Sequence, residues 1–214
     1  GVHTITLTVT DNEGATDTDN ITITVYESTY FENTIWLEPE CAEIGANWDT
    51  IINEHASISQ YVTAKTGFDS PDQAPATDDG LIIIPFTIAS AGNYTVYGRM
   101  NCPSYEDDSF WVKMNSGSFR SFNGLKTNGW EWKNFTAYNL ALGEHTLSIG
   151  YRENGALLDK LFITKYADVP TGIGEQAVNC GFDTLPSAID VNFIAKDDRS
   201  GLLKNYPNPF STST

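Results

Sequence analysis

The chain has 214 residues, of which 40% are hydrophobic, so it can form one sizeable domain together with shorter segments. It carries 12 Lys and Arg against 28 Asp and Glu, a formal net charge of −16, and this acidity argues against nucleic acid or an anionic membrane as a partner. No apolar run reaches the roughly 18 residues that a membrane-spanning helix needs, so we expect no membrane insertion.

Residues 1–27 alternate polar and apolar side chains in the runs Thr4–Val9 and Asn20–Val25, with a turn sequence at Asp11–Gly14 between them. This predicts a two-stranded hairpin, which is too small to form a core alone. Because Gly1 opens inside strand-like sequence without a leader-like stretch, we expect a piece of a longer protein. The segment resembles the C-terminal end of a polycystic-kidney-disease-type (PKD) domain, an immunoglobulin-like spacer of extracellular enzymes.

Residues 34–166 read as the main domain, because they contain many short strand-like runs bounded by turn residues and lack helical periodicity. Short strands at regular spacing predict an all-β fold, an antiparallel β-sandwich of jelly-roll type. The predicted strands are 35–40, 57–64, 81–88, 93–100, 109–114, 118–122, 131–136, 145–151 and 157–164.

Residues 167–202 show little regular pattern and are predicted to be a linker. In residues 203–214, Pro207 and Pro209 argue against a central strand, so this tail is predicted to be irregular. The run LLKNYPNPFSTST resembles the start of the C-terminal sorting domain of the type IX secretion system of Bacteroidetes. This resemblance implies a secreted or cell-surface parent protein that is exported by the type IX machinery.

Four long connections are expected to meet at one end of the sandwich if neighbouring strands follow one another as a meander. We call this end the rim. Long loops at one end, opposite short turns at the other, favour the rim as the functional site. The rim loops are Lys65–Gly80, Asn101–Asp108, Gly124–Gly129 and Arg152–Ala156.

The rim is rich in side chains that suit a sugar, because aromatic planes cover the apolar faces of sugar rings and polar groups bind the hydroxyl edges. The predicted carbohydrate-binding residues are Tyr105, Asp107, Trp130, Trp132, Arg152 and Asn154; Glu106 and Glu153 are additional polar candidates. The alternative for Trp130 and Trp132 is a place in the core. Trp111 is either a second platform on the sheet surface or covered by a neighbouring loop.

The sequence also predicts a cluster of carboxylates. Asp159 alternates in phase with Leu157, Leu161 and Ile163, and Glu38 shares a face of the first strand with Glu40. A buried carboxylate must be paired or bind a metal, and Ca²⁺ prefers such oxygen ligands. The alternative is that both glutamates face solvent and Asp159 accepts a backbone N–H.

The main domain resembles carbohydrate-binding modules of families 6 and 35. The resemblance rests on the segments Trp36–Glu40, Ala91–Val96, Asp107–Val112 and Arg152–Leu161. It implies a β-sandwich that binds its ligand in loops at one end, with a structural calcium held by acids of the first and last strands. Pro39 departs from the small residue expected between the two glutamates.

That calcium pattern falls on Glu38, Glu40 and Asp159. The three cysteines fit no zinc spacing and allow one disulfide with one free thiol. Because the ends of a sandwich come together, Cys41 is expected to pair with Cys180, and the resemblance supports this pairing. Cys102 is then the free thiol.

The sequence contains no HExxH, GxSxG or phosphate-binding loop. We therefore predict a monomeric, non-catalytic carbohydrate-binding module of a secreted, polysaccharide-degrading protein. One alternative is an adhesin or a surface scaffold. Because carboxylate pairs are abundant, a fragment of a glycoside hydrolase or polysaccharide lyase is the other.

Overall fold

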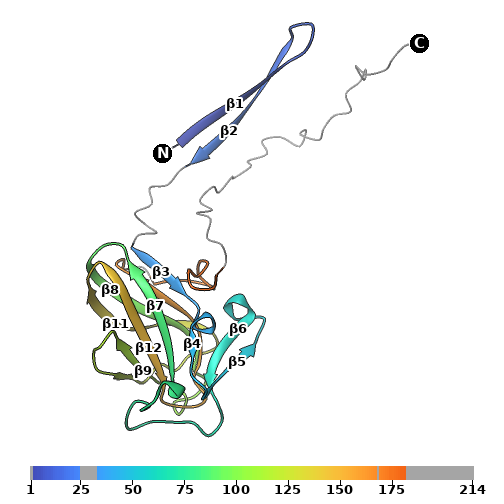
Figure 1. Ribbon diagram of the computed structural model, residues 1–214. Helices are drawn as coiled ribbons and strands as arrows, with labels where there is room; N and C mark the ends of the chain where they lie inside the picture. Colours follow the sequence, from blue (N-terminus) through green and yellow to red (C-terminus); the bar gives the residue numbers. More distant parts are fainter. Residues whose placement is uncertain (1, 25–32, 168, 182–214) are drawn as a thin grey trace. The chain divides into compact units, whose positions relative to one another are not determined.

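The structure is a computed structural model that describes residues 2–24, 33–167 and 169–181, and these form two units, a hairpin and a sandwich (Figure 1). The hairpin pairs β1 (Val2–Thr10) with β2 (Thr16–Thr24) in antiparallel register, with Ile5 opposite Ile21. This agrees with the predicted hairpin. The predicted sorting segment 203–214 lies outside the described residues.

The sandwich consists of two antiparallel sheets, which confirms the predicted all-β fold. The five-stranded sheet has the order β10-β9-β12-β7-β4, and the six-stranded sheet has the order β11-β8-β13-β6-β5, with β3 also paired to β13. The strands are β3 (Thr34–Leu37), β4 (Glu43–Ile44), β5 (Trp48–Ile52), β6 (Gln60–Ala64), β7 (Leu81–Ile88), β8 (Gly92–Asn101), β9 (Phe110–Met114), β10 (Arg120–Phe122), β11 (Glu131–Leu140), β12 (Gly143–Tyr151) and β13 (Leu157–Thr164).

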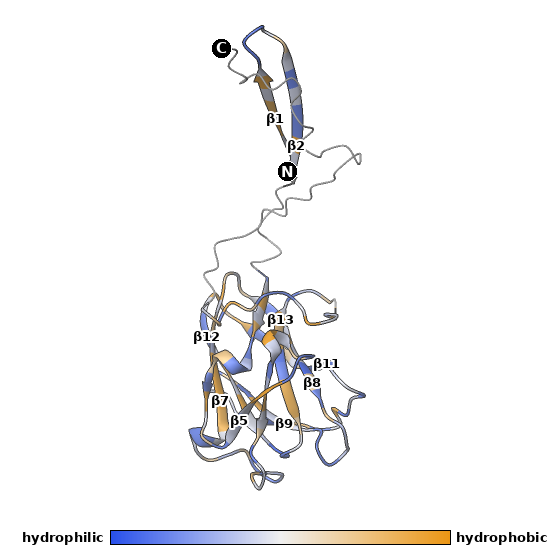
Figure 2. Cartoon of the chain, turned by 90° about the vertical axis from the view of Figure 1, so that its right-hand side faces the viewer, coloured by the Kyte–Doolittle hydropathy of each residue, from blue (hydrophilic) through white to orange (hydrophobic). Residues whose placement is uncertain are grey.

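The main core lies between the two sheets, and Figure 2 shows apolar residues along β7 and β9. Strand β7 illustrates the pattern, since Ile82, Ile84 and Ile88 are fully buried. Pro85 is tolerated in this strand because β4 pairs only with Ile82 and Ile83, so β7 is an edge at the proline. Among the described residues, no helix has the length and hydropathy required to cross a membrane.

Local structure differs from the predicted strand bounds near the first strand. Strand β3 ends at Leu37, and a 3-10 helix at Pro39–Cys41 follows, because the proline starts a helical turn. The predicted strand 57–64 begins with another 3-10 helix, Ser57–Ser59, before β6. Strands β4 and β5 were not predicted.

Residues 169–181, which we call the strap, pack against the sandwich, so the prediction of a linker over 167–202 is wrong for this part. The rest of that range, 182–202, lies outside the described residues. A disulfide joins Cys41 to Cys180 across 139 positions of sequence, the expected pairing. Cys102 is free and buried.

Several further contacts hold the strap in place. Val178 N–H donates to the carbonyl of Trp36 (3.0 Å), and Ala177 is buried. Gly174 has a φ of +72°, and a Cβ there would lie 2.3 Å from the Trp36 ring, so only glycine allows this approach. The domain therefore extends beyond the predicted boundary at residue 166.

Candidate functional site

The four predicted rim loops meet at one end of the sandwich, the lower end in Figure 1. The backbone N–H of Ser70 donates to the carbonyl of Arg152 (2.9 Å). The N–H of Asp108 donates to Glu153 Oε2 (2.8 Å), and the N–H of Leu125 donates to the carbonyl of Asp108 (3.1 Å). The loops therefore meet as predicted, but the meander assumed for the prediction is wrong. Apart from β9 and β10, consecutive strands from β7 to β13 alternate between the two sheets.

Tyr105 is more exposed than Phe68, the other exposed aromatic residue of the described rim loops, with 76% of its surface open against 39%. The Lys126 ammonium lies 4.4 Å from the centroid of its ring. Nearby, Asp107 accepts a hydrogen bond from Ser104 Oγ (2.8 Å). The Asp107 carboxyl lies against Gly155, where a Cβ would come within 2.4 Å of it, so the glycine lets the two loops meet.

Arg152 and Asn154 make hydrogen bonds that hold the last rim loop in position. Arg152 Nη1 donates to Glu153 Oε1 (2.8 Å) and to Ser109 Oγ (2.9 Å), and its side chain is mostly buried. The carbonyl of Asn154 lies 3.4 Å from the hydroxyl of Thr63. These contacts fix the position of the last rim loop, and both side chains stay candidates for ligand binding.

Trp130 and Trp132 do not stand beside Tyr105. Trp130 is half-buried, with its ring 5.3 Å above the Arg99 guanidinium and 5.5 Å from the ring of Tyr61. Trp132 lies opposite Arg99 in the register of β11 and β8, so both tryptophans face outward from the six-stranded sheet. The predicted shared platform is therefore divided between the rim and a sheet face.

Among the predicted carbohydrate-binding residues, Trp132 has the surroundings that differ most from the prediction. It packs with Trp36 and Phe162 in a second apolar cluster, and its Nε1–H donates to the carbonyl of Gly172 in the strap (3.0 Å). The prediction of an open rim platform at Trp132 is wrong because the strap covers this face. For Trp111, the second alternative holds, since its Nε1–H donates to Ser70 in the first rim loop (2.8 Å).

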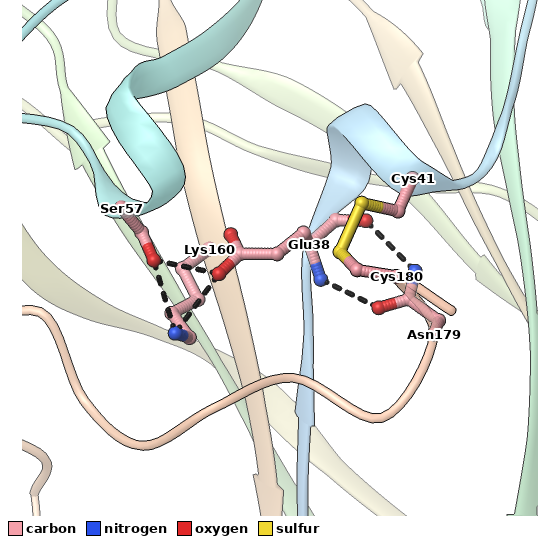
Figure 3. Close-up of a disulfide and its surroundings, with 6 residues drawn as sticks. All are labelled: Glu38, Cys41, Ser57, Lys160, Asn179 and Cys180. Carbon is pink, nitrogen blue, oxygen red and sulfur yellow. Dashed lines mark hydrogen bonds and ion pairs between the residues drawn. A yellow bond between two sulfur atoms is a disulfide. The ribbon is translucent and has the colours of Figure 1, made fainter. Parts of the chain in front are cut away.

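Of the predicted acidic residues, Glu38 lies in a network with Ser57 and Lys160 beside the disulfide of the strap (Figure 3). Glu38 is fully buried, and its Oε1 accepts hydrogen bonds from Ser57 Oγ (2.6 Å) and Lys160 Nζ (2.9 Å). Asp159, also fully buried, accepts the N–H of Ser57 (2.6 Å) and pairs with the Arg99 guanidinium. The side-chain amide of Asn179 in the strap brackets the backbone of Glu38, accepting from its N–H and donating to its carbonyl.

A β-bulge explains this network. The register of β13 against β8 shifts between Leu158 and Lys160, and Asp159 is the extra residue. The predicted alternation therefore changes phase at this point, and Leu158 rather than Leu157 joins the main core with Leu161. The expectation that Asp159 shares a face with Leu161 and Ile163 is wrong for this reason.

The network leaves carboxylate oxygens without partners. Both oxygens of Glu40 and Oε2 of Glu38 are buried and accept no hydrogen bond. Burial raises the pKa of Glu40 to about 10, and the charges of Glu38 and Asp159 act in the same direction. Since Lys160 and Arg99 pair with the other two acids, Glu40 is the carboxylate without a counter-ion.

These observations test the fit of a calcium ion. The donors are the hard oxygens that Ca²⁺ prefers, and the charge of Glu40 has no counter-ion among the described residues. Against this, the described residues contain no group of three or more His, Cys, Asp or Glu side chains arranged to hold a metal. The site fits a cation by its chemistry, with Glu38 and Glu40 as the side chains that would receive it.

Ser57 and Lys160 also form a hydroxyl–amine pair of the kind that can activate a nucleophile, at 3.0 Å. Both residues are buried. A substrate has no access to the hydroxyl, so the pair is a structural element of the network.

No protein-family model and no curated protein matches the chain by sequence. A GH26-CBM35 β-(1,4)-mannanase from Podospora anserina matches 65% of this chain with a TM-score of 0.51 and 19% identity. An exo-β-1,3-galactanase from Phanerochaete chrysosporium matches 61% with a TM-score of 0.50 and 16% identity. The likeness shows a shared fold. This chain spans 29% of the length of each of those enzymes.

Proposed function

We propose that the sandwich with its strap, residues 34–181, is a non-catalytic carbohydrate-binding module that binds a glycan at the rim. The observation that carries this proposal is the exposed ring of Tyr105 at the meeting point of four loops. An aromatic ring open to solvent can stack on a sugar, while polar side chains such as Asp107 bind its hydroxyls.

The shared fold supports this proposal, since the Podospora anserina enzyme is a GH26-CBM35 mannanase. The parent protein is proposed to be a secreted polysaccharide-degrading protein. In it, residues 1–27 are the end of a PKD-type domain, and residues 203–214 are the start of the type IX sorting signal. A binding module would raise the local concentration of such an enzyme on its polysaccharide.

The test is a glycan array followed by affinity electrophoresis with wild-type protein, Tyr105→Ala and Tyr166→Ala. Tyr166 follows β13 at the end away from the rim, so its variant is the matched aromatic control. We expect Tyr105→Ala to weaken binding at least about tenfold, since loss of a stacked ring removes roughly 1.5 kcal/mol or more. The control should bind like wild type.

Three results would contradict the proposal. Binding that survives Tyr105→Ala would place the site elsewhere. Failure to bind any glycan would favour the adhesin or scaffold alternative. Release of reducing ends by the chain alone would identify an enzyme.

A structural calcium ion among Glu38, Glu40 and Asp159 is our second proposal. It is supported by the buried carboxylate oxygens of Glu38 and Glu40 that have no partner. A bound divalent cation would supply the positive charge that Glu40 lacks. Its role would be structural, because the network lies beside the strap rather than at the rim loops.

This proposal is tested by the melting temperature in EDTA and in excess CaCl₂. Calcium should raise it, since a ligand of the folded state stabilises by mass action. Glu40→Gln should abolish the rise, whereas Glu43→Gln, which changes an exposed acid on β4, should keep it. An unchanged melting temperature of the wild type in calcium would show that Glu40 is neutral instead.

A further inference from the structure

The charge of the rim loops differs strongly from neutrality. They carry three basic and eight acidic residues, a net charge of 3 − 8 = −5. The basic residues are Lys65, Arg152 and Lys126. The acidic residues are Asp69, Asp72, Asp78, Asp79, Glu106, Asp107, Asp108 and Glu153.

The three basic side chains are all engaged. Arg152 pairs with Glu153 at 2.8 Å. Lys65 donates to the carbonyl of Ala46 at 2.8 Å and lies 3.8 Å from Asp49. The ammonium of Lys126 is held over the Tyr105 ring. The rim therefore presents no cluster of basic groups, within the described residues, that could receive a carboxylate or a sulfate.

The acidic side chains are mostly open. Five of the eight are exposed. These are Asp69, Asp72, Asp78 and Asp79 in the first loop and Glu106 beside Tyr105. Exposed carboxylates repel a polyanion over a distance set by the Debye length, about 10 Å at 0.1 M salt. They also accept hydrogen bonds from sugar hydroxyls.

We infer that the rim selects an uncharged polysaccharide and rejects uronic and sulfated ones, an inference that rests on the proposed glycan-binding function. Stacking on Tyr105 is indifferent to the charge of the glycan. The exposed carboxylates of the rim loops are sensitive to it, because a polymer with one negative charge per sugar must bring several charges into their field. Selection therefore comes from repulsion, and recognition from the ring and the hydroxyl acceptors.

The experiment compares polymers that share a backbone but differ in charge, using the whole chain. The pairs are β-1,4-mannan with polymannuronate, unsubstituted xylan with glucuronoxylan, and galactan with sulfated galactan. We expect a neutral member to bind and its anionic counterpart to bind at least about tenfold more weakly near 20 mM salt. The difference should shrink as salt is added, because screening weakens the repulsion.

A charge-matched pair of triple variants isolates the rim. Asp69→Asn, Asp72→Asn and Glu106→Gln together remove three charges and keep an acceptor oxygen at each position. The ratio of neutral to anionic affinity should therefore fall at least about threefold. Glu13→Gln, Asp17→Asn and Asp19→Asn in the hairpin change the total charge equally and should leave the preference as in wild type.

The outcomes separate the two proposals. An anionic polymer that binds as tightly as its neutral counterpart, with loss of binding in Tyr105→Ala, would overturn the charge selection and keep the binding function. Equal effects of both triple variants would also overturn it, since the preference would then follow total charge. Binding of neither member of any pair would contradict the proposed function itself.

Discussion

The rim and the outer face of the six-stranded sheet both carry aromatic and acidic residues, but these residues are covered on the sheet face and exposed on the rim. On the sheet face, Trp36, Trp132 and Phe162 pack together under the strap, with Trp36 and Phe162 stacked at 4.0 Å between ring centroids. On the rim, Tyr105 is open and contacts Lys126. The comparison shows that the covering segment, more than strand alternation, decides whether an aromatic ring is available to a ligand.

The acids of the two regions differ in the same way. Glu38 and Asp159 are buried and paired with Lys160 and Arg99, because an unpaired buried charge is costly. Five of the eight acids of the rim loops are exposed to water and need no counter-ion. Stability should therefore depend on the covered region, and binding should depend on the rim.

The largest expected effect comes from removing the strap's covalent attachment. Cys41→Ser with Cys180→Ser opens a loop closed across 139 positions and should lower the free energy of unfolding by about 3–5 kcal/mol. Urea denaturation under oxidising conditions measures this loss, and wild type in reductant should match the variant. A change below about 1 kcal/mol would mean that the noncovalent contacts of the strap suffice.

The second effect is the loss of a buried counter-ion. Lys160→Met leaves Glu38 charged and buried with only the Ser57 hydroxyl, and we expect a loss of about 3 kcal/mol in EDTA. Because that loss comes from the orphaned charge, Lys160→Met with Glu38→Gln should recover more than half of it. If the double variant is no more stable than the single one, the pair contributes through packing.

A smaller effect should separate stability from binding. Trp132→Ala removes a half-buried ring from the second cluster and should cost about 2 kcal/mol of unfolding free energy, while glycan affinity stays within about twofold of wild type. Tyr105→Ala should show the reverse pattern, with a stability change below about 0.5 kcal/mol. A Trp132→Ala variant of normal stability that fails to bind would break the division between the two regions.

The sequence was informative wherever regular alternation continued without interruption. The long strands, the meeting of the four rim loops and the hairpin all follow from period-two patterns and turn residues. Alternation failed at Asp159, because a bulge changes the phase without leaving a mark in the residue types. It also failed for the packing of the strap through Ala177, because such a tertiary contact leaves no period to detect, whereas the attachment of the strap through Cys180 was predicted.

The smallest expected effect is the labelling of Cys102 by a thiol reagent, which tests whether the rim loops open in the folded protein. Cys102 is a buried residue of the rim loop Asn101–Asp108. Its N–H donates to Thr127 Oγ1 (2.8 Å), and its carbonyl accepts the Thr127 N–H (2.9 Å). Burial raises the pKa of this thiol to about 12, and the charge of Asp108 acts in the same direction. A thiol reagent at pH 8 requires both access and the thiolate, so the native protein should stay unlabelled and one thiol should react after unfolding without reductant.

The rate of this labelling distinguishes global from local opening. If Cys102 reacts only as fast as the protein unfolds, its rate should rise with denaturant in parallel with the unfolding rate. Stabilisation of the sheet face should then slow the labelling of Cys102. If it instead reacts in the folded protein at a rate that denaturant does not change, the rim loops open independently. Bound glycan should in that case slow labelling in wild type and leave it unchanged in Tyr105→Ala.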